Sequence, residues 1–381
     1  QGGRPAMNEL RSIIANWKDL AEKGRRSVLL SLVDVVGSSC RRPGARMLAD
    51  EEGWLAGHIG GGCLEGDLLE HARAVLSSGD PKIVTYDLSE SGELAWGLGI
   101  GCPGKIVVLI ELFDEVLVTR FESIAYGEEA LVPVTVFQTN EGSLCSTGER
   151  WIVRSDGSID PPLPKDLPTD EIDRAAREVL EARKTTVRDF GDDESGFRAL
   201  VEYLAPPLKL VVFGSGQDTT ALLVRAADLG WEATVVDPGA VVEARRRVPD
   251  TVRVITAEPA TIMNDLGIDD RTAVVMLSHQ FKRDIALLEY LARSPVPYVG
   301  LIGAYARRDA LLSALSAEDL SDLEARLHAP VGLDIGGEGP EEIALSIAAE
   351  ILAVFNGRSG GFLRAGKGSI HGRLEDAVEG A

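Results

Sequence analysis

The first part of the chain alternates between helical periodicity and short apolar runs. In MNELRSIIANWKDLAEKG the apolar residues share one helical face, which predicts a helix that stops at Gly24. The β-branched run over residues 27–36 predicts a buried strand, and MLA, KIVTYDL and KIVVLIEL predict further strands. A helix is expected over LLEHARAVLSSG. Residues 160–206 are charged and proline-rich around one helix, so we interpret them as a connector closing this domain.

From residue 208 on, strands and helices alternate. LKLVVFG, WEATVVD, VRVI, AVVMLS and PYVGLIG predict strands, and PEEIALSIAAEILAVFNG predicts a closing helix. Such alternation is typical of a doubly wound parallel sheet. The fold class is therefore α/β. We expect a mixed α/β domain over residues 7–206, a Rossmann-like domain over 207–360 and a mobile tail over 361–381.

A short internal echo lies within the first domain. Gly44-Ala-Arg46-Met-Leu48 resembles Gly148-Glu-Arg150-Trp-Ile152, and each copy has a further glycine nine positions after its first. Both copies follow a Gly-Ser-x-Cys segment. The echo indicates either a duplicated strand–loop–strand unit or a chance match, and no function follows from it alone.

Composition and charge exclude several classes of function. The 381 residues carry a formal net charge of −21, which repels the phosphates of nucleic acids. No apolar run is long enough to span a membrane, and the five histidines lack the spacing of a dedicated metal site. The four cysteines show no CxxC pairing, which favours a reduced, cytoplasmic setting. QGGRPAM has no apolar signal region, and we expect the native start at Met7.

A dinucleotide-binding pattern opens the second domain. Gly214 and Gly216 lie between a strand and a helix, and Asp237 ends the next strand at the spacing of a ribose-binding carboxylate. Asp218 and Thr219 argue against tightly bound NAD(P), since one puts a negative charge where a pyrophosphate would lie and the other replaces the third glycine. Asp237 either binds a ribose or ends the strand without a ligand.

His279 follows the fourth predicted strand of this domain, at the edge where α/β sheets bind ligands. It either contacts a phosphate or acts in acid–base chemistry, or it is a solvated residue beside a helix cap.

Two glycine-rich loops in the first domain each carry one cysteine. Gly60, Gly61 and Gly62 lead to Cys63, and GIGCPG holds Cys102. Successive glycine amides can form an anion-binding concavity, and a helix start stabilises a thiolate at Cys63. The alternative is that both cysteines are small buried hydrophobic residues. Glu65 is either a general base or an ordinary acid of the first helical turn.

The segment GSSCRRPGAR concentrates cationic and hydroxyl side chains in an otherwise acidic chain. Ser38, Ser39 and Arg46, with the two neighbouring arginines, suggest contacts to a phosphate or another anionic ligand.

These motifs, taken in order, resemble the XdhC/CoxI family, whose members are accessory maturation factors of xanthine dehydrogenase and related molybdenum hydroxylases. The likeness spans nearly the whole chain through GSSCRRPGARML, GHIGGGCLEGDLLEHA, GLGIGCPGKIVVLIE, LVVFGSGQD, VVMLSHQFKRD, YVGLIGA and RLHAPVGLDIGGEGPEEIALSIAAEI. Gln217-Asp218 replaces the Gly-His of many members, and Pro103 stands where glycine is frequent.

The resemblance implies a protein that binds the molybdenum cofactor transiently, presents it for sulfuration and inserts it into an apo molybdenum hydroxylase. Cys63 or Cys102 would then lie near the metal as a sulfur relay, or as a transient molybdenum ligand in the case of Cys102. A cysteine desulfurase and a second copy of the chain are the further partners that we expect. The rival interpretations are an NAD(P)-dependent oxidoreductase that works with Asp237 and His279, a strict sulfurtransferase, and a scaffold without a ligand.

Overall fold

The chain divides into two compact units, Gln1–Pro206 (unit 1) and Pro207–Ala381 (unit 2). A computed structural model describes residues 3–37, 41–60, 64–87, 104–238, 248–278 and 280–365. The expected tail therefore lies outside the described residues from residue 366 on. In the part that is described, no helix has both the length and the apolar character needed to cross a membrane.

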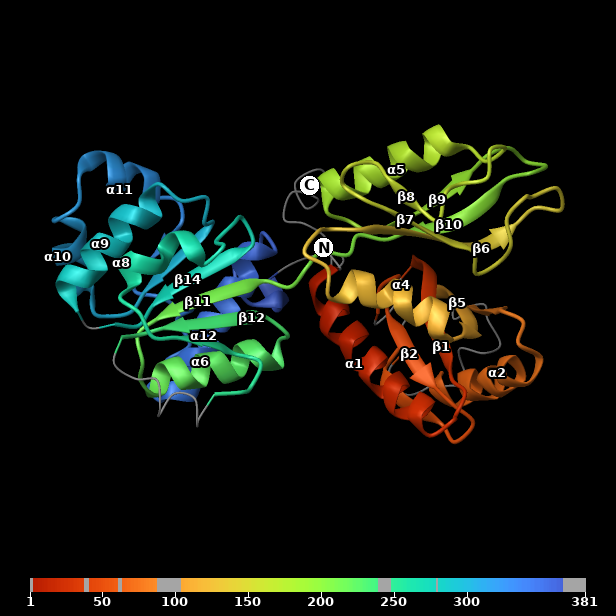
Figure 1. Ribbon diagram of the computed structural model, residues 1–381, viewed down its shortest axis with the longest axis horizontal. Coiled ribbons are helices and arrows are strands. Elements are labelled where there is room, and N and C mark those ends of the chain that lie inside the picture. Colours follow the sequence, from red (N-terminus) through yellow and green to blue (C-terminus); the bar gives the residue numbers. More distant parts are fainter. Residues whose placement is uncertain are drawn as a thin grey trace. The chain divides into compact units, whose positions relative to one another are not determined.

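Unit 1 contains two five-stranded antiparallel sheets (Figure 1). The first half consists of α1 (Gly3–Glu22), β1 (Val28–Gly37), β2 (Arg46–Ala49), β3 (Trp54–Gly57), α2 (Glu65–Ser78), β4 (Lys82–Asp87) and β5 (Gly104–Leu112). The second half consists of α4 (Glu115–Ala125), β6 (Val132–Thr139), β7 (Arg150–Val153), β8 (Ile159–Asp160), α5 (Thr169–Ala182), β9 (Thr186–Phe190) and β10 (Phe197–Val201).

Each sheet of unit 1 has its own apolar core on one face. The helix α2 packs its buried residues Leu68, Ala72 and Val75 against the first sheet, and α5 packs the equivalent stripe of Ile172, Ala176 and Val179 against the second sheet. On the opposite faces, α1 and α4 share one core with residues of both sheets. The two sheets thus enclose a common layer that holds α1 and α4.

The two halves of unit 1 repeat the same topology. The strand orders are β3-β2-β1-β5-β4 and β8-β7-β6-β10-β9, which match strand for strand in chain order. Individual bonds repeat as well, because the amide of Phe113 donates to Ser27 O at 3.0 Å and that of Leu204 donates to Leu131 O at 3.0 Å. The echoed residues Arg46 and Arg150 each begin the second strand of their half.

Residues 160–206 are therefore not the connector that the sequence suggested. They supply α5, β9 and β10, which complete the second sheet. The exposed residues of β9 and the brevity of β8 explain the error, because neither strand gives the apolar run that marks a buried strand.

The halves differ in the connections that follow β3 and β4. Between β4 and β5 lie residues 88–103, whereas β9 and β10 are joined by residues 191–196 alone. Between β3 and α2 the chain reads HIGGGCL, and between β8 and α5 it reads PPLPKDLP. Both glycine–cysteine loops thus belong to the first half.

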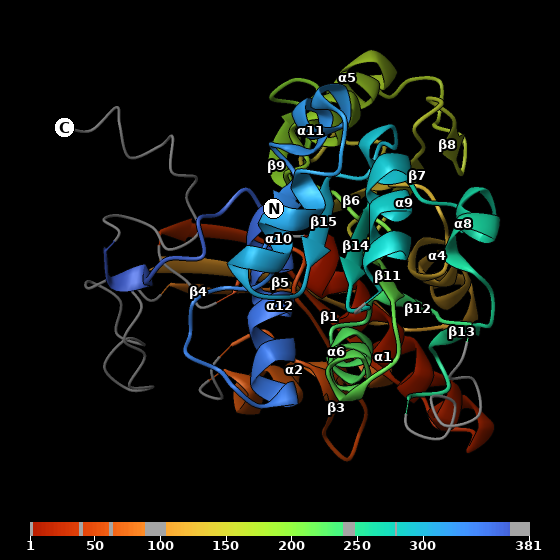
Figure 2. The same ribbon diagram turned by 90° about the vertical axis from the view of Figure 1, so that its left-hand side faces the viewer.

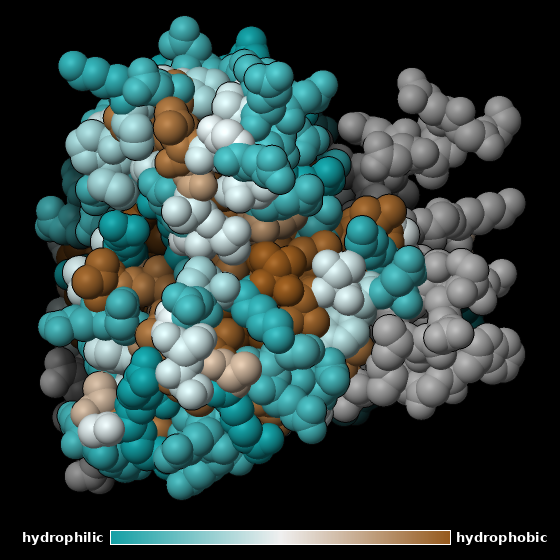
Figure 3. Space-filling model, turned by 90° about the vertical axis from the view of Figure 1, so that its right-hand side faces the viewer, coloured by the Kyte–Doolittle hydropathy of each residue, from teal (hydrophilic) through white to brown (hydrophobic). Residues whose placement is uncertain are grey.

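An apolar cluster joins the two sheets where no helix separates them. Figure 3 shows apolar residues gathered in the middle of one face of unit 1, with hydrophilic residues above and below. The cluster between the sheets has the buried residues Val33, Leu109, Phe137 and Leu200 and the partly buried residues Ile83, Val107 and Val187.

Unit 2 has the predicted Rossmann-like fold. Its six parallel strands run in the order β13-β12-β11-β14-β15-β16, with helices on both faces (Figure 2). The elements are β11 (Lys209–Phe213), α6 (Gln217–Asp228), β12 (Glu232–Val236), β13 (Arg253–Ile255), α8 (Pro259–Ile262), η1 (Met263–Asp265), β14 (Thr272–Met276), α9 (Phe281–Ala292), β15 (Tyr298–Leu301), α10 (Tyr305–Leu312), α11 (Ala317–Leu323), β16 (Leu327–His328), α12 (Pro340–Phe355) and η2 (Leu363–Ala365). The order reverses between β11 and β14, and that switch point is where such sheets bind ligands.

Candidate functional site

The segments that carry most of the predicted site residues start from one end of the first sheet of unit 1. Gly37 at the end of β1 lies opposite Gly104 at the start of β5, and Asp87 at the end of β4 lies opposite Lys105. β3 ends in the same direction, at Gly57. The β1–β2, β3–α2 and β4–β5 connections therefore leave the sheet toward the same side.

Several predicted residues lie within those connections but outside the described residues. They are Ser38, Ser39, Gly61, Gly62, Cys63 and Cys102, and His279 of unit 2 lies outside as well. Their roles stay predictions. Arg46, Gly60, Glu65, Gly214, Gly216 and Asp237 are described.

Glu65 closes the near end of the glycine loop. It is the first residue of α2, and its Oε1 accepts a hydrogen bond of 2.9 Å from the amide of Gly60. A Cβ added at Gly60 would lie 3.4 and 3.5 Å from the two carboxylate oxygens, so the carboxylate packs directly against this backbone. Its Oε2 is buried and has no hydrogen-bond partner within the described part of the chain. Glu65 can thus hold the loop and still accept a further hydrogen bond.

The far end of the β1–β2 loop is held by carboxylates from two other elements. Glu9 of α1 accepts from the amide of Arg46 at 3.0 Å and also pairs with the guanidinium of Arg41. The Arg46 side chain, predicted to contact an anionic ligand, is buried instead and donates to Glu202 at 3.0 and 2.5 Å. Although burial opposes the charge, Glu202 raises the pKa of Arg46, so this arginine stays protonated.

Arg46 and Glu202 also fix Gly44, which lies two residues before Arg46 in the loop. Arg46 donates to Gly44 O at 2.9 Å, and Gly44 has a φ of +98°. A Cβ added at Gly44 would lie 2.6 Å from Glu202 Oε1, closer than real contacts allow. Only glycine fits here, both for its backbone conformation and for the approach of the carboxylate.

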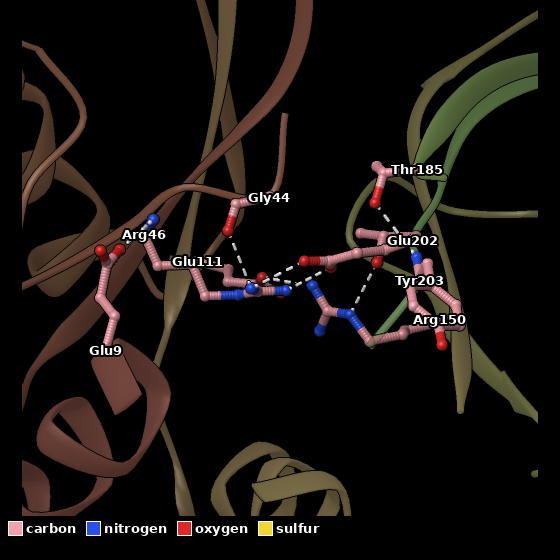
Figure 4. Close-up of polar contacts among 9 residues, drawn as sticks. Glu9, Gly44, Arg46, Glu111, Arg150, Thr185, Glu202 and Tyr203 are labelled. Carbon is pink, nitrogen blue, oxygen red and sulfur yellow. Dashed lines mark hydrogen bonds and ion pairs between the residues drawn. The ribbon is translucent and has the colours of Figure 1, made fainter. Parts of the chain in front are cut away.

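A second buried ion pair repeats the first with the halves exchanged. Arg150 of the second half donates to Glu111 of the first half at 2.8 Å and to Thr135 Oγ1 at 2.8 Å. Figure 4 shows Arg46 and Arg150 reaching toward each other from the two sheets. The ring of Phe121 on α4 serves both, with its centre 5.0 and 5.2 Å from the two guanidinium carbons. We call these four charged residues and Phe121 the crossed ion pairs.

In unit 2 the glycine loop after β11 lies against the end of β14. Gly214 has a φ of +117°, and an added Cβ would lie 2.8 Å from backbone atoms of Leu277 and Ser278. Gly216 faces open space and caps α6. Thr219, which replaces the third glycine, is buried and donates to Gly214 O at 3.1 Å. Asp237 follows β12, so it lies at the same edge of the sheet as the two glycines.

The sequence did not point to the two acidic partners of the crossed ion pairs. The echo of Arg46 in Arg150 was the available signal, but Glu202 belongs to the supposed connector and Glu111 is the penultimate residue of a strand. Within the described residues no group of three or more histidine, cysteine or acidic side chains could hold a metal ion. Cys145 is buried, and this burial raises the pKa of its thiol to about 11, which makes it a poor nucleophile.

Comparison with known proteins adds family information. Residues 20–87 match the model of the XdhC and CoxI family, and residues 210–351 match the model of the XdhC Rossmann domain. A Bacillus subtilis (strain 168) protein, named as a probable xanthine dehydrogenase subunit, is 27% identical over 87% of this chain and 94% of its own length. The molybdenum cofactor insertion chaperone PaoD of Escherichia coli (strain K12) is 22% identical over 90% of this chain and 88% of its own.

A solved structure agrees with these matches. The crystal structure of a xanthine dehydrogenase from Bacillus halodurans superposes with a TM-score of 0.71 at 28% identity, covering 91% of this chain and 97% of that chain.

Proposed function

The chain belongs to the XdhC and CoxI family, and from this premise we propose that it is a chaperone of the molybdenum cofactor. It binds the cofactor transiently, presents it for sulfuration and inserts it into a xanthine dehydrogenase-like molybdenum hydroxylase. The name of PaoD supports cofactor insertion, and the name of the Bacillus subtilis relative supports a hydroxylase partner. A cysteine desulfurase as sulfur donor, a homodimer and a cytoplasmic setting complete the proposal.

The observation that carries the proposal is the convergence of three connections at one end of the first sheet. Gly37, Gly57 and Asp87 all end strands toward that side. The loops that follow hold the glycine amides, the hydroxyls and the two cysteines that suit an anionic, sulfur-ligated cargo. Glu65 adds an acceptor for an N–H group of the pterin.

The two cysteines have distinct roles open to them in this proposal. A thiolate is a soft ligand for molybdenum, and a low thiol pKa also favours persulfide formation. Either Cys63 or Cys102 acts as the sulfur relay. Cys102 is also the candidate for the transient ligand of the metal. Gly214, Gly216 and Asp237 at the switch point of unit 2 form a separate candidate site for a nucleotide.

The test is to purify the protein from a host that makes molybdopterin, oxidise the denatured sample and measure pterin fluorescence. We expect pterin to copurify with the wild type and with a Cys145→Ala control, because that thiol is buried away from the three loops. Cys63→Ala or Cys102→Ala should lose the cofactor or the activation of the hydroxylase. If both variants retain both properties, the sulfur role is wrong.

The oxidoreductase is the second function, favoured by the close packing of Gly214 against β14. If the purified protein contains no pterin and binds NADH with a micromolar Kd, the oxidoreductase is favoured over the chaperone.

A further inference from the structure

The crossed ion pairs connect each arginine-bearing loop of unit 1 to the opposite half. Arg46 ends the β1–β2 loop of the first half and is neutralised by Glu202 of the second half. Arg150 ends the β6–β7 loop of the second half and is neutralised by Glu111 of the first half. Each half thus braces the loop of the other.

The two glutamates occupy the same place in their halves. Glu111 lies opposite Leu29, the second residue of β1, and the amide of Glu202 donates to the carbonyl of Pro133, the second residue of β6. The exchanged bracing is therefore a property of the repeated topology.

The two loops do not carry the same chemistry. The loop that ends at Arg46 reads SSCRRPGA and belongs to the half with both glycine–cysteine loops. The loop that ends at Arg150 reads NEGSLCSTGE and belongs to the half whose other two connections hold neither motif. The β6–β7 loop is therefore the counterpart of the proposed ligand-binding loop. It is braced in the same way but does not carry the same chemistry.

The bracing glutamate lies closer to the loop backbone in the first half than in the second half. Glu202 lies close enough to Gly44 that an added Cβ would be 2.6 Å from its oxygen, whereas the equivalent Cβ at Gly148 would lie 3.5 Å from Glu111. Glu9 adds a second carboxylate on the first loop, with contacts to Arg41 and to the amide of Arg46. Arg41 and Arg46 thus anchor the described part of the loop at both of its ends. A loop whose backbone is already fixed can bind an anion with little loss of conformational entropy.

We propose that Glu202 is a positioning residue for the cofactor site: without touching the cargo, it fixes Gly44 and Arg46 and so sets the path of the β1–β2 loop over residues 41–46. This inference rests on the proposed function, in which that loop binds the molybdenum cofactor. It assigns a role in the site to the half of unit 1 that lacks the cysteine loops.

The symmetry of unit 1 supplies a matched control. Glu202→Gln and Glu111→Gln each remove one carboxylate charge from one buried arginine, so both should lower the melting temperature by similar amounts. Affinity for purified molybdopterin should separate them. We expect the Kd to rise about tenfold or more for Glu202→Gln, as is usual when a support of a ligating group is lost. For Glu111→Gln the Kd should stay within about twofold of the wild type.

A second pair of variants keeps the test decisive if a charge variant does not fold. Gly44→Ala and Gly148→Ala impose similar backbone strain, at φ values of +98° and +88°, and leave all four charges in place. Only Gly44→Ala drives a methyl group into Glu202. The Kd for molybdopterin should rise for Gly44→Ala and not for Gly148→Ala.

Hydrogen exchange of the full-length protein gives a readout that does not need the cofactor. Glu202→Gln should speed exchange in peptides over residues 41–46, and Glu111→Gln should speed it over residues 145–150. Equal changes in Kd within each matched pair would overturn the positioning role. If wild-type protein binds no molybdopterin, the proposed function fails, and hydrogen exchange alone decides whether Glu202 positions the loop. Faster exchange in Glu202→Gln confined to residues 41–46 supports the positioning role. Unchanged exchange over these residues overturns the positioning role.

Discussion

Loss of one partner of a crossed ion pair should destabilise unit 1 far more than loss of the whole pair. The side chains of Arg46 and Glu202 are only 4% and 3% exposed, so removal of either leaves a charge buried without compensation. Arg46→Met should therefore lower the free energy of unfolding by about 3–5 kcal/mol. Loss of the cation–π contact with Phe121, worth about 0.5–2 kcal/mol, places the expected value in the upper part of that range. Arg46→Met/Glu202→Leu removes both charges and should be neutral or stabilising by up to about 4 kcal/mol.

Urea unfolding followed by tryptophan fluorescence measures this difference. Four of the five tryptophans belong to unit 1, and Trp231 belongs to unit 2, so a Trp231→Phe background makes the signal specific for unit 1. With a slope of about 2 kcal/mol per molar urea, Arg46→Met should shift the midpoint by about 1.5–2.5 M. A shift of under about 0.5 M, or a double variant less stable than the single one, would refute the view that an uncompensated charge dominates.

Three further predictions concern unit 2 and the buried thiol. Gly214→Ala should lower the stability of unit 2, measured by hydrogen exchange of its peptides, by about 1–3 kcal/mol, because its methyl group meets the backbone of Leu277 and Ser278 just after β14. Gly216→Ala faces open space and should change that stability little. Burial raises the pKa of Glu350, but hydrogen bonds from His328, Tyr298 and Gly332 outweigh it and lower that pKa below 4.5 overall. The stabilisation by Glu350 is thus present above about pH 4.5 and is lost as the pH falls through the lowered pKa. Glu350→Gln should therefore make the melting temperature less dependent on pH over this acidic range. Cys145, whose pKa is about 11, should react with iodoacetamide at pH 8 much more slowly in native than in urea-unfolded protein, as mass spectrometry of its peptide can show.

The sequence predicted unit 2 better than unit 1 for a physical reason. Parallel strands buried on both faces read as continuous apolar runs, such as VVF before Gly214 and AVVM before Leu277, and each is followed by a helical pattern. The second sheet of unit 1 gives a weaker signal, because only one of the five residues of TVRDF in β9, at the sheet edge, is buried. A proline-rich segment beside it then resembles a linker.

The site was predicted only as far as local motifs allow. Glycine spacing located Gly214, whose positive φ is a property of its own backbone. The role of Arg46 could not be read in the same way, because a sequence shows a charge but not its partner. Glu202 lies 156 positions further along the chain, and only the fold of the two halves brings it to Arg46. An arginine beside serines and glycines looks the same whether it faces an anion or a buried carboxylate.

The exchanged bracing also explains how the two halves of unit 1 can share a core and still differ in their connections. Each buried arginine requires a glutamate from the other half, so the core between the sheets is fixed by residues of both halves and by the Phe121 ring that both arginines share. The five residues of the crossed ion pairs all lie outside the β3–α2 and β4–β5 connections. The β4–β5 connection can therefore be longer than its β9–β10 counterpart, and the β3–α2 connection can hold glycines and a cysteine where β8–α5 holds prolines, without cost to the common core. Glu202, in contrast, contacts Gly44 and Arg46 at the end of the β1–β2 connection, which is the reason to expect an effect of Glu202→Gln on the ligand site as well as on stability.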